Sequence, residues 1–324
     1  IGGVRAVRAL GYNPSVWHMN EGHSAFLGLE RVRDLVQGKG LSFSEAVEAV
    51  RANSIFTTHT PVPAGNDSFG FELVEKFFWQ YWGQLGIDRN GFIDFAAQDL
   101  PWGRQYSMTV LAIRLSAYAN GVSELHGHVS REMWNFLWPQ TPVEEVPIGS
   151  ITNGVHTRTW MVQEIKDLYI KYLPKDWRDE IDNPKTWEAA RTIPDADFWA
   201  VHQQCKVKMI DFARRRLQAM YTRHGEGPQK VAAAGQVLDP KALTIGFARR
   251  FATYKRATLL FHDEERLKRI LHNPERPVQI VFSGKAHPAD EPGKALIQRI
   301  YQLSQTPDYW GKIIFVENYD MNIA

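Results

Sequence analysis

The chain has 324 residues, a length that suggests two domains. With 44% hydrophobic and 23% charged residues, its composition excludes a disordered or collagen-like chain, and its net charge of +2 implies no general attraction to nucleic acid or membrane surfaces. No apolar run reaches the ~18 residues of a membrane-spanning helix, and no signal-peptide core opens the chain. The single cysteine, Cys205, excludes an internal disulfide framework and a multi-cysteine zinc site. We therefore expect a cytoplasmic protein without a metal site.

Short apolar runs alternate with helical periodicity in the first half, as in βαβ units around a parallel sheet. Ser42-Phe43-Ser44-Glu45 has the spacing of a capping box and predicts the start of a helix. Pro and Gly residues within 61–65 end the strand before them. The pattern predicts strands over 15–19 and 54–58, and helices over about 24–36, 42–53, 72–82, 107–121 and 130–137.

The second half carries the clearest pattern. After helices over 163–172 and 197–223, it predicts strands over 243–247, 278–282 and 313–316, with helices over 254–271 and 291–303 between them. That βαβαβ order is half of a doubly wound sheet, so the fold class is α/β. The loop-rich stretch leading to Ile151-Thr152-Asn153-Gly154 separates two expected domains, residues 1–150 and 151–324.

Every predicted strand runs directly into polar, hydrogen-bonding residues, although strand-to-helix loops are often polar for no functional reason. Ligands in open α/β sheets bind beyond the carboxyl ends of the strands. His23 and His59 follow the first two strands, and their imidazoles suit hydrogen bonds to sugar hydroxyls, as does the amide of Asn153. Each alone could equally be structural, but their recurrence favours a shared binding crevice.

The basic residues after the strand over 243–247 are the most informative. Arg249, Arg250, Lys255 and Arg256 are placed at the start of a predicted helix, where cations oppose the helix dipole by ~0.3–1 kcal/mol each. This placement is explained if an anion such as phosphate sits there, and a solvated basic turn is the alternative. No Walker-type loop is present to support nucleoside triphosphate binding. His126 and Cys205 are interpreted as structural residues.

Several ordered motifs make the sequence resemble the α-glucan phosphorylases, the glycogen and maltodextrin phosphorylase family. They occur in family order across nearly the whole chain: residues 16–26 (VWHMNEGHSAF), 56–65 (FTTHTPVPAG), 120–122 (NGV), 152–160 (TNGVHTRTW), the basic stretch 249–256, 284–286 (GKA) and 317–319 (ENY).

The resemblance implies a glycosyltransferase-B architecture of two Rossmann-like domains, both incomplete here, with the site between them. It also implies reversible phosphorolysis of terminal α-1,4-linked glucose to glucose 1-phosphate, and pyridoxal phosphate as a cofactor whose 5′-phosphate exchanges a proton with the substrate phosphate. The expected partners are α-1,4-glucan and phosphate, without nucleic acid or membrane; a homodimer is compatible with this reading.

By position in the family motifs, Arg250 and Lys255 match the catalytic residues that grip substrate phosphate. Arg249 and Tyr319 match residues beside the cofactor, while His23 and Asn153 match residues of the glucose pocket. His59 is counted with these substrate-binding residues.

Some positions depart from the family pattern. Ala117 stands where a glucose-pocket histidine is expected, Arg249 replaces a lysine, and Asp320 stands where an arginine is common. Neither the family's glycine-rich loop nor its cofactor lysine segment is found between Ile1 and Ala324. We therefore expect an internal fragment of a phosphorylase that does not form the cofactor Schiff base by itself.

Two other functions stay open at this point. A nucleotide-sugar-dependent glycosyltransferase of the same fold would also need a cluster of cations for its diphosphate. A non-catalytic fragment that only binds glucan would explain the missing cofactor lysine.

Overall fold

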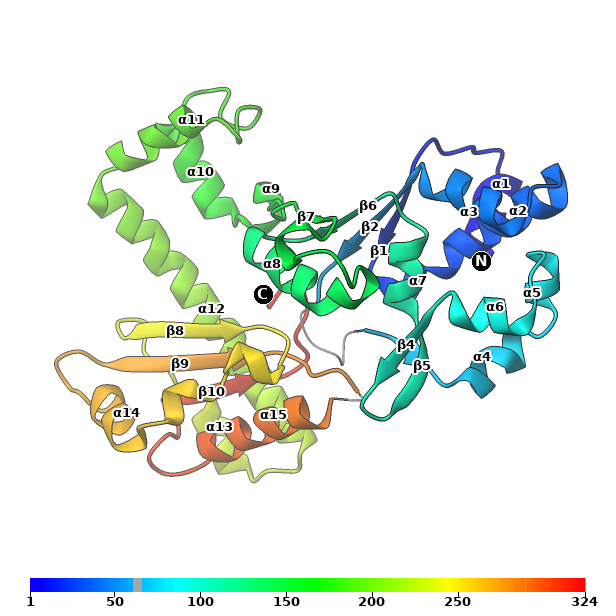
Figure 1. The fold of residues 1–324 in the computed structure, drawn as a ribbon. Coiled ribbons are helices and arrows are strands. Elements are labelled where there is room, and N and C mark those ends of the chain that lie inside the picture. Colours follow the sequence, from blue (N-terminus) through cyan, green and yellow to red (C-terminus); the bar gives the residue numbers. More distant parts are fainter. Residues whose placement is uncertain (61–65, 289, 324) are drawn as a thin grey trace. The chain divides into compact units, whose positions relative to one another are not determined.

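The computed structural model describes residues 1–60, 66–288 and 290–323. The chain divides into two compact units, Ile1–Val155 and His156–Ala324. Helices surround parallel sheets in both units (Figure 1), which confirms the α/β fold class. The turn predicted over residues 61–65 lies outside the described residues.

A four-stranded parallel sheet forms the centre of the first unit. Its strands lie in the order β1 (Trp17–Asn20), β2 (Ser54–Thr58), β6 (Tyr118–Gly121) and β7 (Ile148–Ser150). All three pairings are parallel, so the carboxyl ends of the four strands lie at one edge of the sheet. The loops that follow the strands are therefore neighbours at that edge.

Helices and a small antiparallel sheet complete this unit. The helices are α1 (Gly2–Ala9), α2 (Phe26–Lys39), α3 (Phe43–Arg51), α4 (Phe71–Phe78), α5 (Tyr81–Gln84), α6 (Arg89–Asp94), α7 (Met108–Arg114) and α8 (Glu124–Trp134), with short 3-10 turns at Gly22–Ser24 (η1), Asn135–Leu137 (η3) and Val143–Glu145 (η4). The antiparallel sheet has the order β3 (Ser68–Phe69), β5 (Gly103–Ser107) and β4 (Ala97–Leu100). One hydrophobic core, which includes Met19, Leu29, Phe56 and Leu111, joins α2, α7 and the central sheet.

The capping box is confirmed, because the Ser42 hydroxyl accepts from the Glu45 backbone N–H and the Glu45 carboxylate accepts from the Ser42 backbone N–H. The helix predicted over 107–121 is wrong beyond Arg114. The backbone N–H of Ala117 donates to the carbonyl of Ser54 at 3.1 Å, which draws the chain into the sheet as β6. The sequence pattern also missed β7 and the antiparallel sheet.

The second unit contains a three-stranded parallel sheet in the order β10 (Ile313–Val316), β9 (Val278–Ser283) and β8 (Leu243–Ala248). Alternate residues of β10 enter different cores. Ile313 and Phe315 pack with α14 (Glu264–Leu271) and α15 (Glu291–Ser304), while Ile314 and Val316 pack with α12 (Asp195–Arg223) and α13 (Pro228–Ala234). Helices thus cover both faces of the sheet, as the βαβαβ pattern predicted. The remaining helices are α9 (Thr157–Trp160), α10 (Gln163–Tyr172) and α11 (Pro184–Glu188), with 3-10 turns at Ala189–Thr192 (η5), Thr253–Lys255 (η6) and Leu259–Phe261 (η7).

The helix predicted over 254–271 is largely wrong. The chain forms the two short turns η6 and η7, separated by Arg256 in the left-handed region at φ 52°, and α14 begins only at Glu264. The Asp263 carboxylate caps α14 by accepting from the Arg266 backbone N–H at 2.9 Å. The basic residues therefore do not stand at the start of an α-helix. The prediction that a helix N-terminus helps to bind phosphate at this loop is wrong.

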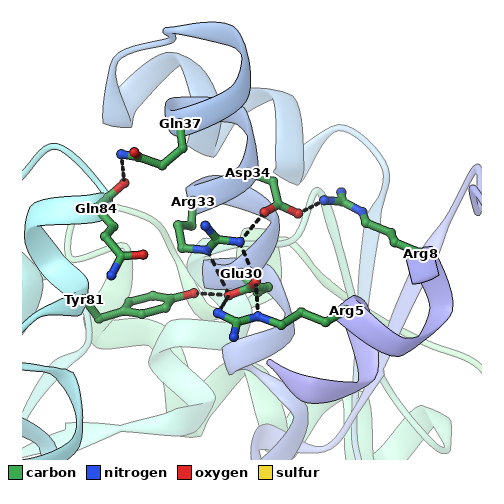
Figure 2. A network of polar contacts seen from close by, with 8 residues as sticks. All are labelled: Arg5, Arg8, Glu30, Arg33, Asp34, Gln37, Tyr81 and Gln84. Atoms are coloured by element: carbon green, nitrogen blue, oxygen red, sulfur yellow. Dashed lines mark hydrogen bonds and ion pairs between the residues drawn. The ribbon is translucent and has the colours of Figure 1, made fainter.

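A buried carboxylate fastens α1 and α5 to α2 in the first unit. Figure 2 shows Glu30 with Arg5, Arg33 and Tyr81 around it. The Arg5 Nε donates to Glu30 Oε1 at 2.6 Å, Arg33 Nη2 donates to the same oxygen at 2.8 Å, and the Tyr81 hydroxyl donates to Oε2 at 2.6 Å. Burial alone would raise the pKa of Glu30, but these hydrogen bonds outweigh it and lower the pKa to about 2.

Candidate functional site

The loops at the carboxyl ends of the second unit's strands are joined by their backbones. The N–H of Arg249 donates to the carbonyl of Ser283 at 3.1 Å, and the N–H of Phe251 donates to the carbonyl of Lys285 at 2.8 Å. The Ser283 hydroxyl in turn donates to the carbonyl of Val316 at 2.8 Å. The segments after β8 and β9 and the end of β10 therefore hold one another in place.

Gly284 allows the closest approach between these loops. A Cβ at this position would lie 2.0 Å from the carbonyl oxygen of Arg249 and 2.6 Å from the ring of Phe251. No side chain fits there without moving the backbone that carries Arg249. The Gly284-Lys285-Ala286 motif thus has a steric role beneath the basic residues.

The cations of this loop interact with one another and have no carboxylate partner among the described residues. We call Arg249, Arg250 and Lys255 the basic turn. Burial lowers the pKa of Lys255, and the positive charges of Arg249 and Arg250 lower it further, so the three groups share one electrostatic environment. Within the described part of the chain, none of the three side chains forms an ion pair. Mutual repulsion between neighbouring cations costs free energy unless an anion offsets it.

Tyr319 lies at the same edge of this sheet. Its hydroxyl donates to the carbonyl of Ala248, the last residue of β8, at 3.3 Å. Asn318, just before it, adopts a left-handed conformation at φ 60°, which turns the chain after β10. The structure therefore brings together Tyr319 and the basic turn, four residues that the sequence assigned to phosphate and cofactor binding.

In the first unit, the second predicted group centres on His59. Its Nε2 contacts the Asn20 side-chain oxygen, and its backbone N–H donates to the Glu21 carboxylate. Because an amide oxygen only accepts, His59 Nε2 is the donor in this contact. Glu21 itself has φ 70° and ψ 165°, a conformation that costs a non-glycine residue about 1–3 kcal/mol.

A second chain of hydrogen bonds ties the neighbouring strands together. The Thr57 hydroxyl donates to the Asn120 side-chain oxygen at 3.0 Å, so His18 Nε2, 2.7 Å from that hydroxyl, must be its donor. Asn120 Nδ2 then donates to the carbonyl of Gly121 at 3.1 Å. This chain fixes the ends of β1, β2 and β6 beside His59.

His23 and Asn153 lie in loops at the same edge but are not joined to His59 by hydrogen bonds among the described residues. His23 is exposed in η1. Asn153 is exposed after β7, and its backbone N–H donates to the carbonyl of Val122 at 3.1 Å. Two of the three predicted glucan-binding side chains thus remain accessible.

Sequence reasoning assigned no role to Glu21 or Lys285, although both stand in the motifs. The Glu21 carboxylate accepts from the backbone N–H of His59, which is 38 residues away, so no short motif could reveal the contact. Lys285 is exposed and directly follows Gly284, so it could have been added to the basic residues. His126, interpreted as structural, is buried, and its Nδ1 accepts from the Val122 backbone N–H at 3.2 Å.

No group of three or more His, Cys, Asp or Glu side chains among the described residues could hold a metal ion. None of the helices in this described part of the chain combines the length and apolar character required to cross a bilayer.

The chain matches a family model described as "Carbohydrate phosphorylase" over residues 9–324. The maltodextrin phosphorylase of Thermococcus litoralis is 45% identical over the whole chain, which covers 38% of that protein. The glycogen phosphorylase of Mycobacterium tuberculosis is 40% identical and is covered to 38%, and that of Aquifex aeolicus is 38% identical and is covered to 46%.

The chain therefore spans 38–46% of the length of these curated relatives. The family model, in contrast, covers nearly every residue of the chain, including the basic turn and the strand ends of both units. On this evidence the chain belongs to the carbohydrate phosphorylase family.

Proposed function

We propose that this chain carries the phosphate-binding and glucan-binding residues of an α-glucan phosphorylase. The reaction is the reversible phosphorolysis of a terminal α-1,4-linked glucose to glucose 1-phosphate. The observation that carries the proposal is the basic turn, whose three cations interact electrostatically and form no ion pair among the described residues. The names of the relatives, maltodextrin and glycogen phosphorylase, support the choice of substrate.

Arg250 and Lys255 bind the attacking orthophosphate in this proposal. A guanidinium offers two parallel donors to phosphate oxygens, and an ammonium adds a point charge, so the pair neutralises and orients the nucleophile. Bound phosphate would favour the protonated form of Lys255 and so oppose the pKa lowering that burial and the two arginines cause.

Arg249 and Tyr319 fit the phosphate of pyridoxal phosphate, because a guanidinium without an ion pair among the described residues and a hydroxyl lie at the same sheet edge. When bound, the cofactor supplies a phosphate group that exchanges a proton with the substrate phosphate. The role of Arg249 is to hold that group against the repulsion of a second phosphate, which amounts to several kcal/mol at reduced dielectric.

His23, His59 and Asn153 bind the glucan in this proposal. The His59 imidazole forms a hydrogen bond with a sugar hydroxyl while Asn20 and Glu21 fix the histidine from two sides. The two units correspond to parts of the two Rossmann-like domains of a glycosyltransferase-B architecture. The cytoplasmic location and the homodimer stay predictions from the sequence.

The test grafts this chain into the Thermococcus litoralis maltodextrin phosphorylase in place of its 45% identical segment. The graft is incubated with maltodextrin and orthophosphate, and glucose 1-phosphate is measured. We expect the product to appear and to disappear when the graft also carries Arg250→Ala. The Thermococcus litoralis enzyme without the graft is the matched control.

The same assay separates the two alternatives. Transfer of glucose from a sugar nucleotide, without phosphorolysis, would favour a nucleotide-sugar-dependent glycosyltransferase. Retention on a glucan column without either reaction would favour a non-catalytic glucan-binding fragment. Either result would overturn the phosphorylase proposal.

A further inference from the structure

A second cluster of cations lies in the first unit, at the edge of the central sheet opposite His59. A cavity of about 690 Å³ there is lined by residues of α1, α2 and α3 and by the segments just before β1 and β2. Asn53, which lines it, directly precedes the first residue of β2. Its volume falls in the range of about 300–1,000 Å³ that small-molecule sites occupy.

Arg31 is the buried member of this cavity, and it has no carboxylate partner within the described residues. Only 6% of the residue is exposed. Its guanidinium donates to the Ser54 hydroxyl at 2.6 Å and to the Asn53 side-chain oxygen, and it lies 5.2 Å from the ring centre of Trp17. All of these partners are neutral. Burial lowers the pKa of Arg31 to about 10, and the charge of Arg8 contributes to the shift.

Two exposed cations, Arg8 and Lys39, line the same cavity, together with one carboxylate, Asp34. That carboxylate is already shared, because it pairs with both Arg8 and Arg33 (Figure 2). The positive charge of the cavity therefore exceeds its negative charge. Buried charges are normally paired, so an anion that enters would offset the desolvation of Arg31.

A purely structural role for Arg31 would be to tie α2 to the end of α3 and the start of β2. That role explains its bonds to Asn53 and Ser54, but it does not explain why Arg8 and Lys39 line the same space. The remaining lining includes hydrogen-bonding side chains such as Asn13, so the cavity suits a small, hydrophilic anion and not an apolar molecule.

We propose that this cavity is an anion site that binds a phosphate group, either orthophosphate or a small phosphate ester, through Arg31, Arg8 and Lys39. Guanidinium groups match the oxygens of phosphate with paired donors, and a lysine adds charge without fixed geometry. The site is separate from the basic turn and does not depend on the proposed phosphorolysis.

The test measures binding of inorganic phosphate to the 324-residue chain by equilibrium dialysis at constant ionic strength, since salt screens exposed charges. Arg250→Ala is present throughout to weaken binding at the basic turn. We expect one bound phosphate per chain, with Arg31→Met weakening its affinity about 10-fold or more. Lys39→Ala should weaken it by a smaller factor, while Lys76→Ala, an exposed lysine on α4, should leave it unchanged.

A parallel titration follows the Arg31 side-chain Nε–H resonance, so that binding remains measurable if Arg31→Met fails to fold. A shift of this resonance with phosphate supports the site. Methyl phosphate in place of inorganic phosphate separates the two sources. If methyl phosphate binds as tightly as phosphate, the site accepts a phosphate ester; if only phosphate binds, the ligand is the free ion. Absence of a shift, or affinities that neither Arg31→Met nor Lys39→Ala changes, would overturn the proposal.

Discussion

Around Glu30, cations and carboxylates alternate, whereas the basic turn carries cations alone. Arg5 and Arg33 both bind Glu30, and Arg33 also reaches Asp34, so each positive charge there has a negative neighbour. Arg249, Arg250 and Lys255 have no such partner in the described parts of the chain. A satisfied network contributes to stability, while an unsatisfied one is explained by a ligand that completes it.

The two regions also differ in what holds them. The Glu30 network is built from side chains that join three helices. The basic turn is held by backbone hydrogen bonds and by the absence of a side chain at Gly284. Cations that are positioned by backbone remain free to bind, because their side chains form no ion pair within the described part of the chain.

The largest effect is expected from Gly284→Ala, which tests the role of the backbone. The new Cβ would lie 2.0 Å from the Arg249 carbonyl oxygen, so the loop must move. We expect a loss of about 3 kcal/mol in the free energy of unfolding, measured by urea denaturation, together with weaker phosphate binding. Gly246→Ala, where a Cβ meets no atom within 4 Å, is the control. Equal stability of both variants would contradict the steric role.

Glu30→Gln tests the paired region. Removing the buried charge leaves Arg5 and Arg33 without their shared carboxylate, and we expect a loss of about 2–3 kcal/mol in unfolding free energy. Phosphate binding should not change, because Glu30 lines neither proposed phosphate site. Glu48→Gln, on an exposed ion pair with Arg51, should cost less than about 1 kcal/mol. A similar cost for both variants would show that burial of Glu30 contributes little.

Much of the fold follows from sequence pattern because its signals are local. The strands Ser54–Thr58 and Ile313–Val316 and the helix Gln163–Tyr172 have the predicted bounds. Each is a short apolar run or an amphipathic repeat between clear breaks. The capping box at Ser42 is equally local, since both of its partners lie within four residues.

The predicted helices are wrong where contacts between residues far apart in the sequence determine the structure. The segment 107–121 has helical periodicity, yet its end pairs with β2 because the backbone of residue 117 bonds to Ser54. The segment 254–263 is broken by the left-handed Arg256, a conformation that no residue-type preference announces.

In the candidate site, too, local features were predicted and contacts between distant residues were not. The basic turn was found because its three cations and Arg256 stand within eight consecutive residues of the sequence. The contact of His59 with Asn20 and Glu21 was not foreseen, because it joins two strand ends that are 38–39 residues apart. Arg31 was missed because its proposed role rests on its burial without a carboxylate partner among the described residues. Neither its burial nor its partners can be seen before the fold is known.

Arg250→Ala tests the basic turn. A charge-assisted bond to phosphate is worth about 2 kcal/mol, so the affinity of the basic turn for phosphate should fall about 30-fold, measured as KM in the graft. The unfolding free energy and glucan binding should stay nearly constant, because this side chain is exposed and makes no ion pair among the described residues. A comparable loss of phosphate and glucan binding would contradict its assigned role.

The stability that the Glu30 network contributes should also depend on pH. The pKa of Glu30 is lowered to about 2 in the folded chain and is about 4.3 in an unfolded one. The unfolded state therefore binds the proton first, so the contribution of Glu30 to stability is complete at neutral pH and declines as the pH falls from about 5 towards 2. The stability difference between the native chain and Glu30→Gln should shrink over this range in urea titrations. Because the basic turn contains no carboxylate, the corresponding difference for Arg250→Ala should not vary with pH, and a constant Glu30 difference would contradict the lowered pKa.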